Sequence, residues 1–139
     1  MIKEYSPQYL DAIMDIWLSA NQTAHSFISN AYWQNAYAET KQQIPKAEVF
    51  VFEQEGVVKG FVGIAGQAFV AGLFVKNEYQ QQGIGQKLLA HCQKRYGRLE
   101  LDVYAKNEKA VRFYQKNGFS IAATKANNGY TEHRMVWEG

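Results

Sequence analysis

Three consecutive segments near the middle of the chain have the composition of β-strands that are apolar on both faces. They cover residues 49–52, 57–65 and 69–75, and Glu55-Gly56 between the first two is a hairpin signal. A strand with one face in water alternates apolar and polar residues, whereas a sheet buried on both sides has continuous apolar runs. The chain therefore needs helices over both faces of its sheet.

Helical periodicity on either side of these strands predicts the covering elements. The apolar residues from Leu10 to Trp17 recur at i, i+3, i+4 and i+7, and Ser6-Pro7 is typical of a helix start. Helices are predicted at about 7–20, 30–44, 83–96 and 107–116, further strands at about 2–5, 99–104, 119–124 and 130–137, a loop at 21–29 and a turn at 127–129. The order β-α-α-β-β-β-α-β-α-β-β indicates an α+β fold with a mixed central sheet and helices on both faces.

The size and composition of the chain indicate one domain, covering residues 1–139. A chain of this length with 47% hydrophobic residues fills one core. No apolar stretch approaches the roughly 20 residues of a membrane-spanning helix, and the N-terminus lacks the layout of a signal peptide. We therefore expect a soluble, cytoplasmic protein without a membrane partner, in which the single cysteine, Cys92, is a small buried hydrophobe.

The charges are unevenly distributed along the chain. The net charge of +2 is too small to indicate a nucleic-acid partner. Residues 1–75 contain 4 basic and 7 acidic side chains, which gives −3, whereas residues 76–139 contain 11 basic and 6 acidic ones, which gives +5. The second half therefore favours an anionic ligand, although a solvated basic surface without a ligand is the more common origin of such a charge distribution.

A polar turn with two glycines joins the strand at 69–75 to the helix at 83–96. Gly83 and Gly85 permit close approach of a ligand, and the first N–H groups of a helix favour an anion such as phosphate. The turn is not a P-loop, because Gln86-Lys87-Leu88 replaces the required Lys-Ser/Thr. It is not a dinucleotide fingerprint, because Leu88 stands where a third Gly or Ala belongs. By itself the turn indicates an anion site or a plain helix start.

A second block, Asn107–Phe119, follows one strand and one helix later. Together with Gln80-x-x-Gly83-x-Gly85, its Asn…Ala…Phe-Tyr…Gly-Phe pattern resembles the GCN5-related N-acetyltransferases. The resemblance is strong over residues 49–125, and the order of elements extends it over nearly the whole chain. A weaker likeness, through Trp17-Leu18-Ser19, Ala24–Ile28 and Tyr32-Trp33, is to a subgroup of small bacterial protein-lysine acetyltransferases.

The resemblance implies acetyl-coenzyme A as cosubstrate and no metal. The main chain of the strand at 73–75 would hold the pantetheine arm like an added strand, and amides from Gln81 or Gln82 to Lys87 would hold the pyrophosphate, with charge added by Lys87 and Lys116. Asn107 would bond the cofactor arm, cap the following helix, or both. The implied cofactor-binding residues are Leu73, Phe74, Val75, Gln80, Gln81, Gln82, Gly83, Ile84, Gly85, Gln86, Lys87, Asn107, Phe113 and Tyr114.

The resemblance also implies that Tyr114 is the general acid that protonates the departing thiolate, although a core tyrosine is the alternative. Many family members carry a glutamate on the strand before the pyrophosphate turn, but residues 67–75 contain no carboxylate. The general base is therefore open among Glu78, Glu100, Asp102, His25 and water. Because this glutamate is missing, a catalytically silent acyl-coenzyme A sensor is an alternative to an enzyme. The presence of a tyrosine at position 114 argues against that alternative.

The implied acceptor is a primary amine. A protein lysine or N-terminal amine is favoured over a small molecule such as a polyamine, aminoglycoside or amino acid. Candidate acceptor-site residues are His25, Phe27, Tyr32, Trp33 and Phe69, although aromatic residues are also typical of a core. The length of the acyl chain and the choice between monomer and homodimer are left open.

Overall fold

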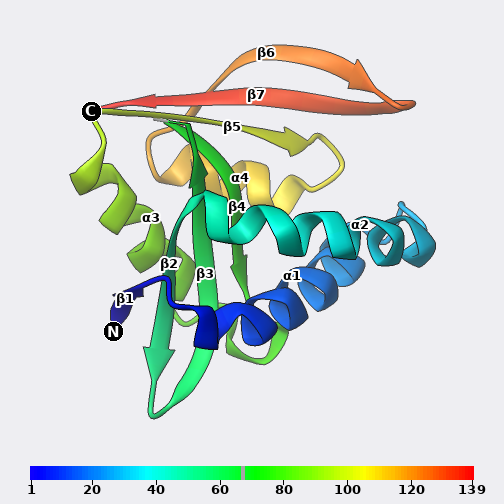
Figure 1. Ribbon diagram of the computed structural model, residues 1–139. Coiled ribbons are helices and arrows are strands. Elements are labelled where there is room, and N and C mark those ends of the chain that lie inside the picture. The colour runs from blue at the N-terminus through cyan, green and yellow to red at the C-terminus, as the bar shows by residue number, and fades with distance from the viewer. Residues whose placement is uncertain (67) are drawn as a thin grey trace.

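The computed structural model describes residues 1–66 and 68–139 (Figure 1). The elements are β1 (Ile2–Glu4), η1 (Pro7–Tyr9), α1 (Leu10–Ala24), α2 (Asn30–Gln43), η2 (Ile44–Lys46), β2 (Glu48–Gln54), β3 (Val57–Ala65), β4 (Phe69–Val75), η3 (Asn77–Tyr79), α3 (Ile84–Arg95), β5 (Arg98–Tyr104), α4 (Glu108–Lys116), β6 (Ser120–Asn127) and β7 (Tyr130–Glu138). The predicted α+β class and order of elements are confirmed. Gln67, part of the carboxylate-free stretch, lies outside the described residues.

The strands form one mixed sheet in the described part of the chain, in the order β1-β2-β3-β4-β5-β7-β6. Neighbouring strands are antiparallel except β4 and β5, which are parallel. A parallel pair needs a crossover, and α3 supplies it. The polar turn before α3 therefore lies at the carboxyl end of β4, where ligands of such sheets commonly bind.

Two hydrophobic clusters cover the two faces of the sheet. Along β2, Phe50 packs with α3 and α4, whereas its neighbour Val51 packs with α1 and α2. This alternation follows from the two-residue period of a strand, and Figure 1 shows the two helix pairs on opposite sides. The predicted helices on both faces are confirmed. Cys92 is fully buried in the α3 cluster, as expected, and burial raises the pKa of its thiol to about 12.

Local differences from the expected boundaries have identifiable causes. The helix expected to stop before the loop at 21–29 continues to Ala24, because the His25 N–H donates to the Asn21 carbonyl at 2.9 Å. The C-terminal hairpin turn is Asn128-Gly129, whose φ values of 51° and 84° fit a two-residue turn, so Asn127 belongs to β6. Within the described residues, no helix combines the length and apolarity needed to cross a membrane.

Strands β4 and β5 separate soon after they meet. Their only paired register among the described residues is Phe69 with Glu100, and Figure 1 shows the two strands diverging toward their carboxyl ends. The Lys76 N–H donates to the Lys59 carbonyl on β3. Because main-chain groups alternate in direction along a strand, those of Leu73 and Val75 point to the open side. The divergence thus leaves a strand edge without a neighbouring strand.

Candidate active site

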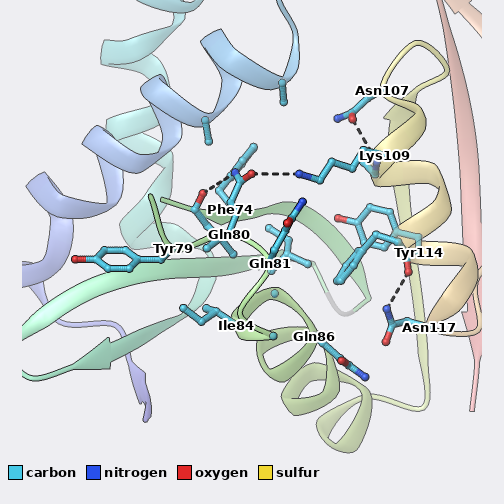
Figure 2. Close-up of a pocket in the computed structure, with 18 of the residues that line it drawn as sticks. Phe74, Tyr79, Gln80, Gln81, Ile84, Gln86, Asn107, Lys109, Tyr114 and Asn117 are labelled. Atoms are coloured by element: carbon cyan, nitrogen blue, oxygen red, sulfur yellow. Dashed lines mark hydrogen bonds between the residues drawn. The ribbon is translucent and has the colours of Figure 1, made fainter. Parts of the chain in front are cut away.

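A cavity of about 700 Å³ lies at this divergence, between β4, the start of α3, α4 and the end of α1 (Figure 2). Its lining includes twelve of the fourteen cofactor-binding residues expected from the sequence, namely Leu73, Phe74, Val75, Gln80, Gln81, Gly83, Ile84, Gly85, Gln86, Asn107, Phe113 and Tyr114. The fold therefore brings the two sequence blocks, which are separated by β5, to opposite walls of one cavity.

The N-terminal end of α3 faces the cavity with unused N–H groups. Gly83, the N-cap residue, has φ +83°, a left-handed conformation that glycine adopts without strain, and makes no side-chain cap. The first bond of the helix runs from the Lys87 N–H to the Gly83 carbonyl at 3.0 Å, so the preceding helical N–H groups are not used within the helix. A Cβ on Gly85 would lie 3.5 Å from Phe113 and 3.7 Å from Val75. This end of α3 is suited to an anion.

Two of the expected cofactor residues do not line the cavity. The Lys87 N–H is already bonded within α3, and its ammonium lies 5.7 Å from the centre of the Phe52 ring on β2. Gln82 is exposed and does not contribute to the lining. Lys87 therefore lies outside the lining in this structure, because the helix directs its side chain onto β2.

Lys109 was not identified from the sequence, although it lies in the second block. Its ammonium crosses from α4 to donate to Gln80 Oε1 at 3.5 Å, as drawn in Figure 2. Gln80 in turn donates to the Val75 carbonyl at 3.1 Å, which ties the glycine turn to the end of β4. Lys116, the other expected source of charge, also lines the cavity. The described lining residues include these two lysines and no carboxylate, so the cavity has a positive potential.

Tyr114 comes from α4 and is 9% exposed. Its ring packs edge-on against Phe113 and Phe119, with centroid distances of 5.2 and 5.4 Å. Figure 2 shows its hydroxyl oxygen pointing into the cavity. Burial raises the pKa of the Tyr114 hydroxyl above its usual value, which keeps the group protonated at neutral pH.

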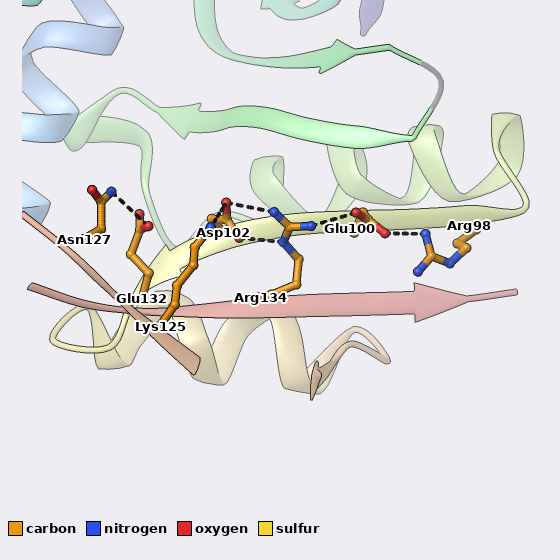
Figure 3. Close-up of polar contacts among 7 residues, drawn as sticks. All are labelled: Arg98, Glu100, Asp102, Lys125, Asn127, Glu132 and Arg134. Atoms are coloured by element: carbon orange, nitrogen blue, oxygen red, sulfur yellow. Dashed lines mark hydrogen bonds and ion pairs between the residues drawn. The ribbon is translucent and has the colours of Figure 1, made fainter. Parts of the chain in front are cut away.

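The three carboxylates considered as general bases lie outside the cavity lining. Glu100 and Asp102 point to the opposite face of β5 from its buried leucines and bind Arg134 of β7, at 2.9 and 2.6 Å (Figure 3). The hydrogen bond from Arg134 lowers the pKa of Asp102. Glu78 is exposed and pairs with Lys76 at 3.6 Å. Charge pairing across β5 and β7, which the sequence did not show, occupies the first two groups.

His25 is the one base candidate with a side chain in the described lining of the cavity. It is 8% exposed, and burial lowers its pKa to about 4, so the ring is neutral at physiological pH. Its Nδ1 lies 2.9 Å from Asn21 Oδ1, and its Nε2 lies 3.1 Å from Asn107 Nδ2. Asn107 Oδ1 also accepts from the Ala110 N–H at 3.3 Å, so the predicted helix cap is present.

The aromatic acceptor candidates do not line the cavity themselves. Trp33 and Phe27 pack around His25, with ring centroids 5.5 and 5.8 Å from the imidazole, and Tyr32 is 45% exposed beside Trp33. The Arg134 guanidinium carbon lies over Phe69, 5.5 Å from the centre of the phenyl ring. Phe69 is at the end of β4 where β4 and β5 are still paired. Ala110, the alanine of the Asn…Ala…Phe-Tyr pattern, also lines the cavity, whereas the remaining contributors were not singled out from the sequence and are Ala20, Ala24, Tyr79, Lys109 and Asn117.

Comparison with known proteins places the chain in a family. It matches the acetyltransferase (GNAT) domain model over residues 2–138. It is 36% identical over 122 residues to the peptidyl-lysine N-acetyltransferase YiaC of Escherichia coli strain K12, covering 87% of this chain and 84% of the relative. It is 31% identical over 113 residues to the peptidyl-lysine N-acetyltransferase YjaB of Salmonella typhimurium strain LT2, covering 80% and 77%. The chain belongs to the GNAT family and is an acyltransferase.

Solved structures agree with this assignment at the level of the fold. The solution structure of apo-form YjaB from Escherichia coli matches with a TM-score of 0.86 at 23% identity, covering 100% of this chain and 97% of the other. The PaiA N-acetyltransferase of Thermoplasma acidophilum, solved in complex with coenzyme A, matches with a TM-score of 0.84 at 18% identity, covering 100% and 98%. The GNAT-like mixed sheet expected from the sequence is confirmed.

Proposed function

We propose that this chain transfers the acetyl group of acetyl-coenzyme A to a primary amine, that of a protein lysine or a protein N-terminus. The observation that carries the proposal is the meeting, in one cavity, of an unpaired strand edge, an uncapped helix start and a buried tyrosine. Each of these features suits one part of an acyl-coenzyme A ester. Their combination is more specific than any of them alone.

The residues present fit the cofactor. The open edge offers the main-chain groups of Leu73 and the N–H of Val75 to the amides of a pantetheine arm, as an added strand would require, since the Val75 carbonyl already accepts from Gln80. The unused N–H groups at the start of α3 suit a pyrophosphate, and Lys109 and Lys116 add positive charge beside it. The coenzyme A in the structurally similar PaiA protein supports the same assignment here.

The acceptor assignment rests on the relatives. The curated relatives at 36% and 31% identity are both named peptidyl-lysine N-acetyltransferases, and each alignment covers more than three quarters of both chains. The aromatic residues around His25 pack against it where it lines the cavity beside the end of α1, and we propose this side for the acceptor amine.

Tyr114 is the proposed general acid. Attack by a neutral amine forms a C–N bond, breaks the C–S bond and leaves a thiolate that needs a proton. A phenol kept protonated by burial, with its hydroxyl directed into the cavity, supplies that proton. Since Glu78, Glu100 and Asp102 lie outside the lining and the Nε2 atom of His25 is engaged with Asn107 at 3.1 Å, the proton lost by the amine passes to water.

Thiol release from acetyl-coenzyme A tests the function directly. Two classes of peptide are tested as acceptors: lysine peptides with a blocked N-terminus, and peptides with a free N-terminus whose lysines are acetylated. The small-molecule acceptors are polyamines, aminoglycosides and free amino acids. We expect turnover with one or both peptide classes. Turnover with small amines alone would contradict a protein acceptor. Coenzyme A binding without turnover on any acceptor would support a silent sensor.

Lys109→Met is expected to weaken coenzyme A binding about 10-fold, because a charge-assisted bond to a phosphate is lost. The measurement is calorimetric titration with coenzyme A and, in parallel, KM for acetyl-pantetheine, which lacks the phosphates. The effect should vanish with acetyl-pantetheine. Lys41→Met is the matched control, because Lys41 pairs with Asp11 at 3.3 Å and lies outside the cavity. Equal losses with both cofactors would show that Lys109 does not bind phosphate.

A further inference from the structure

A chain of side-chain hydrogen bonds joins α1 to α4 across the active-site cavity. It runs from the Trp17 carbonyl through Asn21 and His25 to Asn107 and the Ala110 N–H, with distances of 2.9, 2.9, 3.1 and 3.3 Å. The central contact joins residues 82 positions apart in sequence. Asn21 and His25 are 2% and 8% exposed, so their polar atoms depend on one another for hydrogen bonds.

The two ends of this chain determine the direction of every bond in it. Asn21 Nδ2 donates to the Trp17 carbonyl, so Asn21 Oδ1 is the acceptor that faces His25. His25 Nδ1 must therefore carry the proton, and Nε2 must be an acceptor. At the other end, Asn107 Oδ1 accepts from the Ala110 N–H, so its NH₂ group faces His25 Nε2. The two directions agree at His25, which leaves no donor facing a donor.

We propose that His25 is a positioning residue that holds the Asn107 amide with its NH₂ group toward the cofactor arm. An NH₂ group has two hydrogens, of which His25 Nε2 takes one. Asn107 lines the cavity, so the second hydrogen is available to a carbonyl of the pantetheine arm. This inference rests on the proposed function, since it assumes that the arm occupies the cavity.

The surroundings of His25 support a fixed ring. Tyr104 packs edge-on at 5.0 Å between centroids, and Trp33 and Phe27 pack at 5.5 and 5.8 Å. These three contacts come from β5, α2 and the segment between α1 and α2. Because the Nε2 lone pair is engaged by Asn107, His25 in this arrangement does not serve as the general base. The His25 imidazole therefore links the aromatic residues packed around it to Asn107, which lines the cavity proposed for the cofactor.

The tautomer of His25 is a direct test that needs no activity. Long-range ¹H–¹⁵N correlation spectra of the wild-type protein at pH 7 distinguish a proton on Nδ1 from one on Nε2. The chain has three histidines, and the spectrum of His25→Gln assigns the signals of His25 by their loss. We expect the neutral Nδ1–H form. A neutral Nε2–H form, or a charged ring, would overturn the proposal because Asn107 could not donate to Nε2.

Two variants test the consequence for the cofactor. His25→Phe keeps a ring in the aromatic cluster but removes the acceptor, and we expect coenzyme A to bind about 10-fold more weakly, with kcat at saturating cofactor within about 3-fold of wild type. His25→Gln keeps an acceptor near the Nε2 position, and we expect it to restore affinity to within about 3-fold. Calorimetry gives the affinities, and initial rates separate KM from kcat.

The outcomes separate this inference from the proposed function. If the wild type does not bind coenzyme A, the proposed function fails, whatever the tautomer. If the wild type binds coenzyme A and both His25 variants bind it as tightly as the wild type does, the positioning role fails and the proposed function stands. A kcat lost at full cofactor saturation in both variants would also overturn the proposal, because it would make His25 a participant in the proton transfers.

Discussion

Tyr114→Phe is expected to lower kcat about 100-fold, with coenzyme A affinity unchanged, because the thiolate then departs without a positioned proton. The ring stays in place between Phe113 and Phe119, so the packing of α4 is kept. The measurement is thiol release at saturating acetyl-coenzyme A with the best acceptor, together with calorimetric titration of coenzyme A.

Tyr104→Phe is the matched control for this prediction. Tyr104 is a half-buried tyrosine, and burial raises its pKa to about 12, but it does not line the cavity. Removing its hydroxyl should leave kcat within about 3-fold of wild type, since it donates no proton in the reaction. If Tyr114→Phe and Tyr104→Phe lose the same factor, the loss reflects general perturbation and Tyr114 is not the general acid.

Gly83→Asp is expected to weaken coenzyme A binding about 100-fold or more, because it places a carboxylate where the pyrophosphate would sit. The new carboxylate would also accept the unused N–H groups at the start of α3 and so compete with the phosphate for them. A Cβ at this position meets no atom within 4 Å, so the strain of the substitution comes from the φ of +83° and not from crowding. Calorimetric titration with coenzyme A measures the loss.

Gly83→Asn isolates the charge from the backbone conformation. Asparagine has nearly the shape of aspartate and is among the side chains that tolerate the φ of +83° found here. We therefore expect similar thermal stability for the two variants and a much smaller loss of affinity in Gly83→Asn. Normal binding by Gly83→Asp would place the cofactor elsewhere. Equal losses in both variants would assign the effect to the backbone.

The positions of the helices and strands were largely predictable because short-range patterns determine them. Strands β3 and β4 have the predicted bounds, and Glu55-Gly56 is the predicted turn, with φ values of 55° and 77°. These features depend on neighbours within a few residues, through side-chain alternation and the φ that a turn requires. The end of α1 was missed because it depends on bonds within the final turn, between Asn21 and His25.

The direction of individual side chains at the site was less predictable. Lys87 has the right residue type and place in the motif, but the helical period directs it to Phe52 and away from the cavity. Glu100 and Asp102 looked available as bases, but the β5–β7 register places Arg134 directly beside Asp102. Both outcomes depend on which element lies opposite, and a single sequence does not contain that information.

The sequence by itself determined the class of fold and the two blocks proposed to bind an anion and to present Tyr114, because composition, periodicity and motif spacing are local properties of the chain. Only the tertiary structure decided how those blocks meet. The divergence of β4 from β5 opens the cavity between them, and Lys109 reaches across it to Gln80. The contact between His25 and Asn107 likewise exists only because folding brings the end of α1 to the start of α4, and hydrogen bonds act only between atoms about 3 Å apart.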